Sequence, residues 1–357
     1  MTQTPEVALP CPAGEIRIGG RKSELAVAQS EIVKSLIESH CPATSCSIVA
    51  IKTLGDVRLD RALYTFGGKS LWTRELEALL LGNAGNFKQI DLIVHSLKDL
   101  PTNLPEEFEL GCITEREDPR DALVMKRGSP FMSLGQLPAG SVIGTSSMRR
   151  SAQLMMHYPH LRFESVRGNL RSRIRKLDEG DTFACIILAA AGMHRIGLKP
   201  RITQYLNSDE MYYSVGQGSL GVEIRRGDPR ISKILAHIEH IPSAYRCIAE
   251  RSLMRHLEGG CSVPLGVNTH YDETTKILSF KAIIVSPDGQ ECAEASIEMP
   301  IKCREDCVKA GIQLGDKLVA RGGKKILDAI DYQRINQPPQ SSSENSSLFT
   351  TSSPTTS

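Results

Sequence analysis

Long hydrophobic runs are missing from this sequence. No apolar stretch approaches the roughly 20 residues that a membrane-spanning helix requires. Aromatic residues make up 5% of the chain and include one tryptophan, so there is little surface on which nucleic-acid bases could stack. The formal net charge of +2 is small for a general nucleic-acid binder. We therefore expect neither a membrane nor a nucleic-acid partner.

The first residues also lack the marks of a targeting segment. Residues 1–14 show neither a basic start followed by an apolar core nor an arginine-rich amphipathic pattern. The ten cysteines form no C-x-x-C pair, and Cys303 and Cys307 are merely one helical turn apart. We therefore expect a cytoplasmic protein in which nine cysteines are reduced and structural.

The tenth cysteine, Cys261, lies in the glycine-rich run LEGGCSVPLG at residues 257–266. The upstream pattern predicts a helix from Ser243, as N-cap, to Glu258, and Gly259 stands where a left-handed cap belongs. Cys261 then follows a helix end, in a loop whose glycines allow close approach of a ligand. This run indicates a thiol presented for covalent attachment, although a free cysteine is more often a small buried hydrophobe.

Strand and helix patterns alternate through the first two thirds of the chain. Strands are predicted at 15–20, 47–53, 91–94, 110–114, 122–125, 141–144, 161–166 and 184–189, and helices at 25–39, 73–81, 151–157 and around 171–175. Such alternation predicts a parallel or mixed sheet with helices on both faces. We interpret the glycine-rich stretch 215–223 as the chain returning to its first lobe. The predicted fold class is α/β, with two βα lobes joined by two crossings around a cleft.

The last structured part of the chain has a different pattern. Strands are predicted at 266–270, 277–285 and 291–299 and a helix at 305–318, and the turn sequence SPDG at 286–289 joins two of these strands. We expect a small C-terminal α+β domain with a three-stranded antiparallel sheet. The predicted domains are 15–114 plus 219–238, 115–218 and 239–331, and the tail 332–357, rich in Ser, Thr and Pro, is expected to be disordered.

Cationic side chains gather at the predicted strand ends. One lobe carries Arg149, Arg150, Arg167, Arg173 and Arg195, and the other carries Arg21, Lys69 and Lys98. Guanidinium groups hold carboxylates or phosphates in two-point contacts, so this number on one rim indicates a ligand with many anionic groups. A polycarboxylate fits better than a nucleic acid because stacking residues are few.

Eight short runs stand out along the chain: RKS at 21–23, GGK at 67–69, HSLKDLP at 95–101, EREDPRD at 115–121, GTSSMRR at 144–150, RGN at 167–169, GQG at 216–218 and LEGGC at 257–261. Together they resemble the hydroxymethylbilane synthase family, also called porphobilinogen deaminase. The resemblance covers about residues 15–330, in the family's order.

The resemblance implies three domains, the first two like a type II periplasmic binding protein, and a dipyrromethane cofactor held to Cys261 by a thioether. It implies a transferase that condenses four porphobilinogen molecules head to tail on that cofactor, with release of ammonia. Hydrolysis then frees hydroxymethylbilane for tetrapyrrole and heme biosynthesis. A monomer without a metal is expected.

The same resemblance implies roles for individual residues. Asp99 is the expected catalytic residue, because a carboxylate would stabilise the cationic azafulvene that remains when porphobilinogen loses ammonia. The expected cofactor-binding residues besides Cys261 are Lys98, Ser146, Ser147, Arg149, Arg150 and Arg173. The expected substrate-binding residues are Arg21, Ser23, Lys69, Arg167, Arg195 and Gln217.

Two other classes of protein share part of this pattern. A solute-binding module would have the two lobes and the anion sites, but it has no use for a Gly-Gly-Cys loop in a third domain. A cysteine hydrolase would use Cys261 and needs a histidine base, for which His256 is the nearest candidate in the sequence. Unmodified intact mass would favour either of these, whereas added dipyrromethane favours the synthase.

Overall fold

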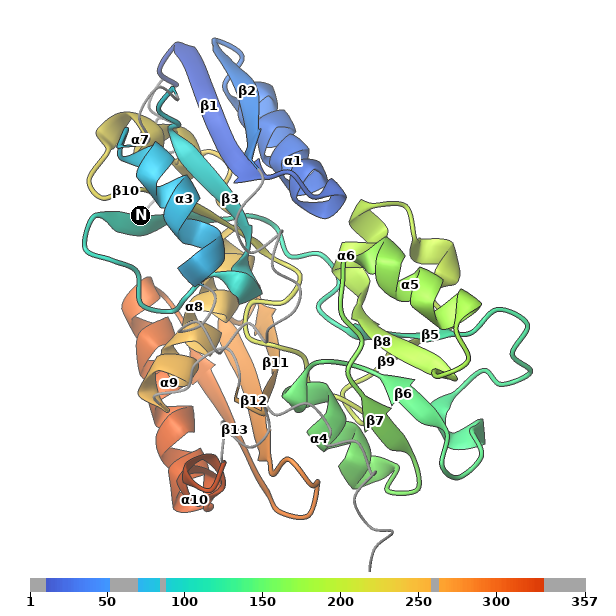
Figure 1. Cartoon of the computed structure of the whole chain (residues 1–357). Coiled ribbons are helices and arrows are strands. Elements are labelled where there is room, and N and C mark those ends of the chain that lie inside the picture. The colour runs from blue at the N-terminus through green and yellow to red at the C-terminus, as the bar shows by residue number, and fades with distance from the viewer. Residues whose placement is uncertain (1–10, 52–69, 84–87, 258–262, 331–357) are drawn as a thin grey trace, which may run out of the picture.

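The computed structural model describes residues 11–51, 70–83, 88–257 and 263–330 (Figure 1). The predictions made for Lys69, Cys261 and the tail at 332–357 therefore lie outside the described residues. Within the described part, no helix is long and apolar enough to cross a membrane. In Figure 1 the first lobe lies at the upper left, the second at the right and the third domain at the lower left.

The first lobe is a five-stranded mixed sheet in the order β2-β1-β3-β10-β4. Its strands are β1 (Gly14–Arg21), β2 (Thr44–Ile51), β3 (Leu92–Ser96), β4 (Phe108–Ile113) and β10 (Leu220–Arg225), and its helices are α1 (Glu24–His40), α3 (Ser70–Leu80) and α7 (Pro229–Ala236). β1 runs parallel to β2 and β3, whereas β10 is antiparallel to β3 and β4. The strand β10 is the predicted return of the chain to this lobe.

The return begins with a turn that only glycine fits. Gly218 has a φ of +94°, and a Cβ atom there would lie 2.3 Å from the carbonyl oxygen of Glu117. Both facts exclude a larger side chain, because the left-handed region and the close backbone approach each penalise a Cβ. The extended structure therefore starts at Leu220 rather than at 215, where the sequence pattern predicted it.

The second lobe repeats this strand order as β7-β6-β8-β5-β9. Its strands are β5 (Asp121–Met125), β6 (Val142–Gly144), β7 (Arg162–Glu164), β8 (Cys185–Ala189) and β9 (Gln204–Leu206). Its helices are α4 (Met148–His157), α5 (Leu170–Glu179) and α6 (Ala190–Arg195), and short 3-10 turns span Leu134–Gln136 and Lys199–Arg201. β6 is parallel to β7 and β8, and β5 is antiparallel to β8 and β9. The predicted pair of βα lobes is confirmed.

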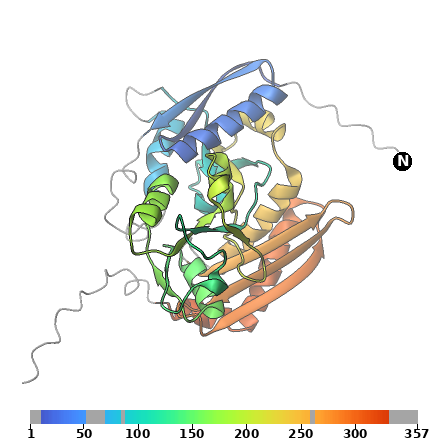
Figure 2. The same cartoon turned by 90° about the vertical axis from the view of Figure 1, so that its right-hand side faces the viewer.

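The third unit is the predicted antiparallel sheet, β11-β12-β13, covered by helices (Figure 2). Its elements are α8 (Ile241–His256), β11 (Leu265–Asp272), β12 (Ile277–Val285), β13 (Cys292–Pro300), α9 (Arg304–Ala320) and α10 (Gly323–Asp328). Leu253 of α8, Phe280 of β12 and Leu314 of α9 are fully buried in one core. The α+β prediction for this domain is confirmed.

Two helix starts differ from the prediction. α8 begins at Ile241 with Pro242 in its first turn and His240 as N-cap, because proline fits the first turn of a helix. Ser243, the predicted cap, is buried inside the helix, where its hydroxyl accepts a hydrogen bond from the N–H of Arg116 (2.9 Å). α4 begins at Met148 rather than at 151.

The prediction of nine reduced cysteines is wrong at two positions. Cys11 and Cys41 form a disulfide that ties the segment before β1 to the end of α1. Nothing in the spacing of these two residues marks them as a pair, since 30 positions separate them. The free cysteines in the described part are Cys46, Cys112, Cys185, Cys247, Cys292, Cys303 and Cys307.

Candidate active site

Lys98 and Asp99 stand at the end of a buried strand. β3 is buried from Leu92 to Val94 and continues into a 3-10 turn, Leu97–Asp99. Leu97 is buried and its N–H donates to the carbonyl of Ser219 (3.0 Å), which anchors the turn to the returning segment. Lys98 is half-buried and Asp99 is exposed. Both side chains therefore occupy the carboxyl end of a strand, as predicted, where ligands bind in open α/β sheets.

Gln217 connects the two lobes beneath this turn. Lys98 Nζ donates to its Oε1 (3.0 Å), and its Nε2 donates to Asp121 Oδ1 (2.9 Å) and to the carbonyl of Pro119 (2.7 Å). The residue is 1% exposed. Its amide is engaged by protein groups on both sides, so it fixes the distance between Lys98 and the second lobe.

Arg149 and Arg150 share one buried carboxylate, that of Asp121. Arg149 Nη1 lies 2.7 Å from Oδ2, while Arg150 Nη2 and Nε lie 2.8 and 3.1 Å from Oδ1. Each guanidinium also donates to a carbonyl, Arg149 to Tyr212 (2.7 Å) and Arg150 to Ile187 (2.8 Å). All three charged side chains are buried. Two cations on one carboxylate leave an excess of positive charge inside the second lobe.

The electrostatics of this cluster follow from its geometry. Burial alone would raise the pKa of Asp121, but the guanidiniums of Arg149 and Arg150 outweigh it and hold the pKa far below its usual range. Burial lowers the pKa of Arg149, and Asp121 opposes that effect. Asp121 was missed as a site residue by sequence reasoning. The available signal was its position as the last residue of the run EREDPRD.

Arg173 is the arginine of the second lobe whose charge interacts with Asp99 of the first lobe. Asn169 caps α5 by accepting a hydrogen bond from the N–H of Ser172 (2.8 Å), and Arg173 Nε donates to the Gly168 carbonyl (2.8 Å). Burial and the nearby charge of Arg150 together lower the pKa of Arg173 to about 10, while the Asp99 carboxylate acts in the opposite direction. The Asp99 carboxylate of the first lobe and the half-buried Arg173 cation of the second therefore interact across the lobes.

Three further predicted residues lie on the second lobe. Ser146 Oγ donates to the Val166 carbonyl (2.7 Å), and Ser147 is the N-cap of α4. Arg167 is exposed, with its Nε 3.4 Å from Ser165 Oγ. These residues border the turn before α4 and the turn before α5.

The other predicted residues lie at the ends of a strand and of helices in the two lobes. Arg21 ends β1, and the Ser23 hydroxyl accepts from the N–H of Ala26 (3.3 Å) as the N-cap of α1. Arg195 ends α6, and its Nη2 donates to the Gly218 carbonyl (2.5 Å). Burial lowers the pKa of Arg195 to about 10, against the effect of Glu117.

An ion pair joins the lobes beside the site. Arg171 of α5 donates from Nε and Nη2 to the two carboxylate oxygens of Glu24 on α1, at 2.6 and 2.7 Å. In Figure 1 the end of α1 points at α6, and these helices pack together. The two lobes therefore touch through α1 on one side and through α5 and α6 on the other.

A buried ion pair holds the two segments that connect the lobes, around Arg116 and Gly216, against the third domain. Arg116 Nη1 and Nη2 lie 2.6 and 3.1 Å from the carboxylate oxygens of Glu250, which also accepts the N–H of Gly216 (2.8 Å). Glu250 belongs to α8, the helix that leads into residues 258–262. This support was not predicted, because 134 positions separate the partners.

Two family models match the chain. One is described as "Porphobilinogen deaminase, dipyromethane cofactor binding domain" and covers residues 16–233, more than half of the chain. The other is described as "Porphobilinogen deaminase, C-terminal domain" and covers residues 244–320. The chain belongs to the porphobilinogen deaminase family.

Curated relatives agree with this membership. Porphobilinogen deaminase of Candida albicans is 60% identical over 329 residues, which are 92% of this chain and 96% of the relative. The Saccharomyces cerevisiae protein of the same name is 53% identical over 322 residues, 90% of this chain and 98% of the relative. Among solved structures, the match to the methionine binding protein MetQ covers 63% of this chain and 89% of the MetQ chain, with a TM-score of 0.40 and 12% sequence identity.

The chain is thus a transferase of tetrapyrrole biosynthesis. It condenses four porphobilinogens head to tail, with release of ammonia, and yields hydroxymethylbilane from a chain grown on a dipyrromethane cofactor. The described residues fit that cofactor: its pyrroles carry acetate and propionate groups, and the second lobe holds the buried guanidiniums of Arg149 and Arg150 and the half-buried one of Arg173.

Proposed function

We propose that Asp99 is the catalytic carboxylate of this synthase and that the arginines of the second lobe hold the carboxylates of the cofactor and of the growing chain. The observation that carries the proposal is the exposed position of Asp99 in the turn that ends β3, where its charge acts on Arg173 of the other lobe. A single catalytic carboxylate beside a set of cations is the arrangement that this chemistry needs.

Asp99 acts on the substrate's developing charge. Loss of ammonia from porphobilinogen leaves a cation delocalised over the pyrrole, and a fixed carboxylate beside the ring nitrogen stabilises that charge as it forms. The exposed side chain of Asp99 can reach an incoming pyrrole. The same carboxylate can accept the proton that is released when the new carbon–carbon bond forms.

The cofactor, when bound, would supply the pyrrole carbon to which the first substrate adds. Arg173 holds one of its carboxylates directly, since this half-buried guanidinium is partly desolvated and stands at the turn before α5. Arg149 and Arg150 provide positive potential from within the lobe, and Lys98 provides it from the first lobe. Ser147 donates a hydrogen bond at the turn before α4, and Ser146 does so once its hydroxyl proton turns away from the Val166 carbonyl. Cys261, outside the described residues, forms the thioether.

Substrate binding is assigned to cations at the margin of the same region. Arg167 is exposed and free to follow a lengthening chain of carboxylates, and Arg21 and Ser23 border the region from the first lobe. Arg195 acts from the end of α6. Gln217 acts by positioning Lys98 and Asp121, and Lys69, outside the described residues, is proposed to close over the site.

The organisation proposed for the whole chain has three domains, 15–114 plus 219–238, 115–218 and 239–331. We propose a cytoplasmic monomer that binds no nucleic acid and no membrane. The small net charge and the scarcity of aromatic residues support this view.

Intact mass and turnover test the function together. The purified chain should carry the added mass of one dipyrromethane, and porphobilinogen should yield ammonia and a linear tetrapyrrole. Cys261→Ser is the matched control, because it removes the attachment atom and leaves a hydroxyl of similar size. A chain of unmodified mass that releases no ammonia would refute the proposed function.

A further inference from the structure

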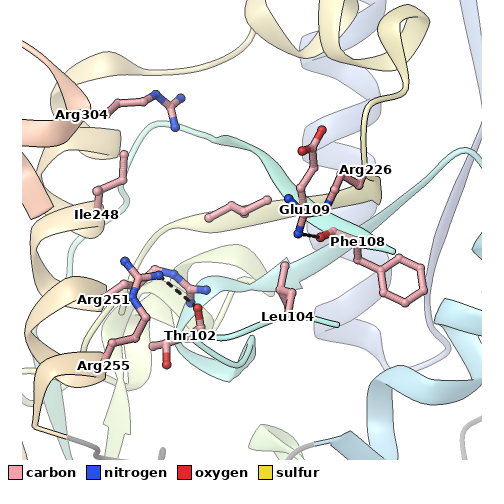
Figure 3. Close-up of a pocket in the computed structure, with 10 residues that line it drawn as sticks. Thr102, Leu104, Phe108, Glu109, Arg226, Ile248, Arg251, Arg255 and Arg304 are labelled. Carbon is pink, nitrogen blue, oxygen red and sulfur yellow. Dashed lines mark hydrogen bonds between the residues drawn. The ribbon is translucent and has the colours of Figure 1, made fainter. Parts of the chain in front are cut away.

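A second concentration of arginines lies away from Asp99, at the junction of the first lobe and the third domain. It lines a cavity of about 290 Å³ between the segment leading into β4, the turn after β10 and the helices α8 and α9 (Figure 3). The arginines of this cavity, here called the arginine pocket, are Arg226, Arg251, Arg255 and Arg304. None of them belongs to the residues assigned to the reaction.

The pocket carries more guanidinium than carboxylate groups. Among its lining residues, all of which belong to the described part, Glu109 is the one with a carboxylate. Its Oε1 accepts the N–H of Gly227 (3.2 Å). Arg304 pairs with Glu239, behind the pocket, through two contacts of 2.5 Å. The lining therefore has a positive potential.

Three of the guanidiniums, those of Arg226, Arg251 and Arg255, donate to uncharged carbonyl oxygens. Arg226 donates to the carbonyls of Glu106 (2.5 Å) and Phe108 (2.9 Å), and Arg255 donates to the carbonyl of Thr102 (3.2 Å). A carbonyl satisfies a donor without cancelling its charge. Arg255 is exposed, but neighbouring groups partly desolvate its guanidinium and lower its pKa. An anion in the cavity would reverse that penalty.

The shape of the pocket sets the kind of ligand. Arg251 and Arg255 are four residues apart, so they project from one face of α8, and Figure 3 shows both directed toward the segment of Thr102 and Leu104. Arg226 faces them across the cavity. The volume is at the lower limit of small-molecule sites, which are about 300–1,000 Å³. Apolar Leu104 and Ile248 complete the lining and suit a compact organic anion.

We infer that the arginine pocket is a second anion site, which binds a compact dianion bearing carboxylate or phosphate groups. Such a ligand bridges the first lobe and the third domain. Arg251 holds the carbonyls of Leu100 and Pro101, the two residues after Asp99, at 3.0 and 2.7 Å. The ligand therefore also contacts the support of the turn that carries Asp99.

Calorimetric titration of the cofactor-loaded enzyme tests this inference, with inorganic pyrophosphate and succinate as separate probes. Acetate at matched ionic strength controls for screening of surface charge. At least one dianion should bind saturably and raise Tm, because it binds only the folded chain. The probe that binds more tightly shows whether the pocket prefers phosphate or carboxylate groups. Failure of both dianions to bind would overturn the inference.

Variants locate the bound anion. The double variant R226Q/R255Q should weaken binding roughly tenfold or more, because two charge-assisted contacts are lost. Arg321→Gln is the matched control, since Arg321 also donates to a carbonyl, that of Glu294, but outside the pocket. Arg167→Gln removes a cation at the catalytic region. Loss of binding in Arg167→Gln, with binding retained in R226Q/R255Q, would assign the anion to that region and refute the pocket.

A variant that should strengthen binding keeps the inference testable even if the double variant fails to fold. Glu109→Gln removes the lining carboxylate and keeps an oxygen that can accept the N–H of Gly227. This variant should bind the dianion several-fold more tightly, because the repulsion is gone while the contacts remain. Unchanged or weaker binding in Glu109→Gln would contradict the inference even if R226Q/R255Q failed to fold.

Discussion

Asp121 is the residue on which the positive charge of the second lobe depends. Without it, Arg149 and Arg150 would be two buried guanidiniums in contact with carbonyl oxygens alone. Burying such charges is costly unless they are paired, and breaking a buried pair leaves an uncompensated ion. The chain therefore uses one carboxylate to keep two cations inside the lobe.

Replacing Asp121 with asparagine should destabilise the fold by about 3–5 kcal/mol at pH 7, as expected when one partner of a buried ion pair is removed. The folded-state pKa of Asp121 is lowered. Its contribution is therefore complete above the unfolded pKa of about 3.9 and is lost as pH falls below that value. Denaturant unfolding at pH 7, 5 and 3.5 checks both the size and the pH dependence.

Asp181→Asn is the control for this experiment, since Asp181 is fully exposed and pairs with Lys126 at the surface. It should change the free energy of unfolding little. An Asp121→Asn variant as stable as the control would show that the buried cluster tolerates two unpaired arginines, contrary to our account.

Arg173 and Arg150 should respond differently to replacement by leucine. Burial disfavours the Arg173 cation, so Arg173→Leu should keep or raise the Tm of the cofactor-free protein while the cofactor is lost. Arg150→Leu removes a partner of Asp121 and should lower Tm as well. Thermal melting of cofactor-free protein, with intact mass for cofactor content, separates the two. Equal Tm losses would contradict the distinction.

At the scale of elements, the contact of α1 with α5 and α6 controls how the lobes approach. The Glu24–Arg171 pair is exposed, so it should contribute little to unfolding stability, but it acts across the lobes. The pair can therefore shift a conformational balance that global stability does not report.

Glu24→Arg should open the lobes, because it sets two like charges against each other. The expected result is a larger radius of gyration by small-angle X-ray scattering, reversed in high salt, with Tm nearly unchanged. Glu31→Arg, on the exposed face of the same helix, is the control and should leave the radius unchanged. An unaltered radius in Glu24→Arg would show that the lobes are held by other contacts.

The elements that sequence predicted well are those with strong local signals. Alternation of apolar strands and helices predicted both lobes, and the turn at 286–289 predicted the antiparallel sheet. Local signals failed at α8, where Pro242 in the first turn outweighed Ser243 as a start signal. β9 was missed because three residues are too few to show periodicity.

The contacts that make the site could not be predicted from spacing. Asp121 lies 28 residues from Arg149, and Arg116 lies 134 residues from Glu250. Only the fold brings such partners together, and because both pairs are buried, losing one partner would destabilise the fold. The sequence identified Asp99 and the arginines as candidates. The carboxylate of Asp121, which Arg149 and Arg150 share, and its contact with Gln217 depend on the tertiary fold.

At the scale of the whole molecule, the two lobes meet with side chains of opposite charge. The first contributes the exposed carboxylate of Asp99, and the second contributes buried cations that attract carboxylates. The third domain is joined to both through Arg116 and Glu250. Chemistry is therefore assigned to the first lobe and ligand charge to the second.

The most direct test of this account is single-turnover ammonia release by Asp99→Asn, on protein whose cofactor content has been confirmed by mass. Asparagine keeps the shape and removes the charge, so release should fall by roughly 10²–10³ or more, while the cofactor is retained. Asp99→Glu keeps the charge one methylene away and should be slowed but measurable. Near-normal release from cofactor-loaded Asp99→Asn would show that another group stabilises the cation, and the assignment of the catalytic carboxylate would be wrong.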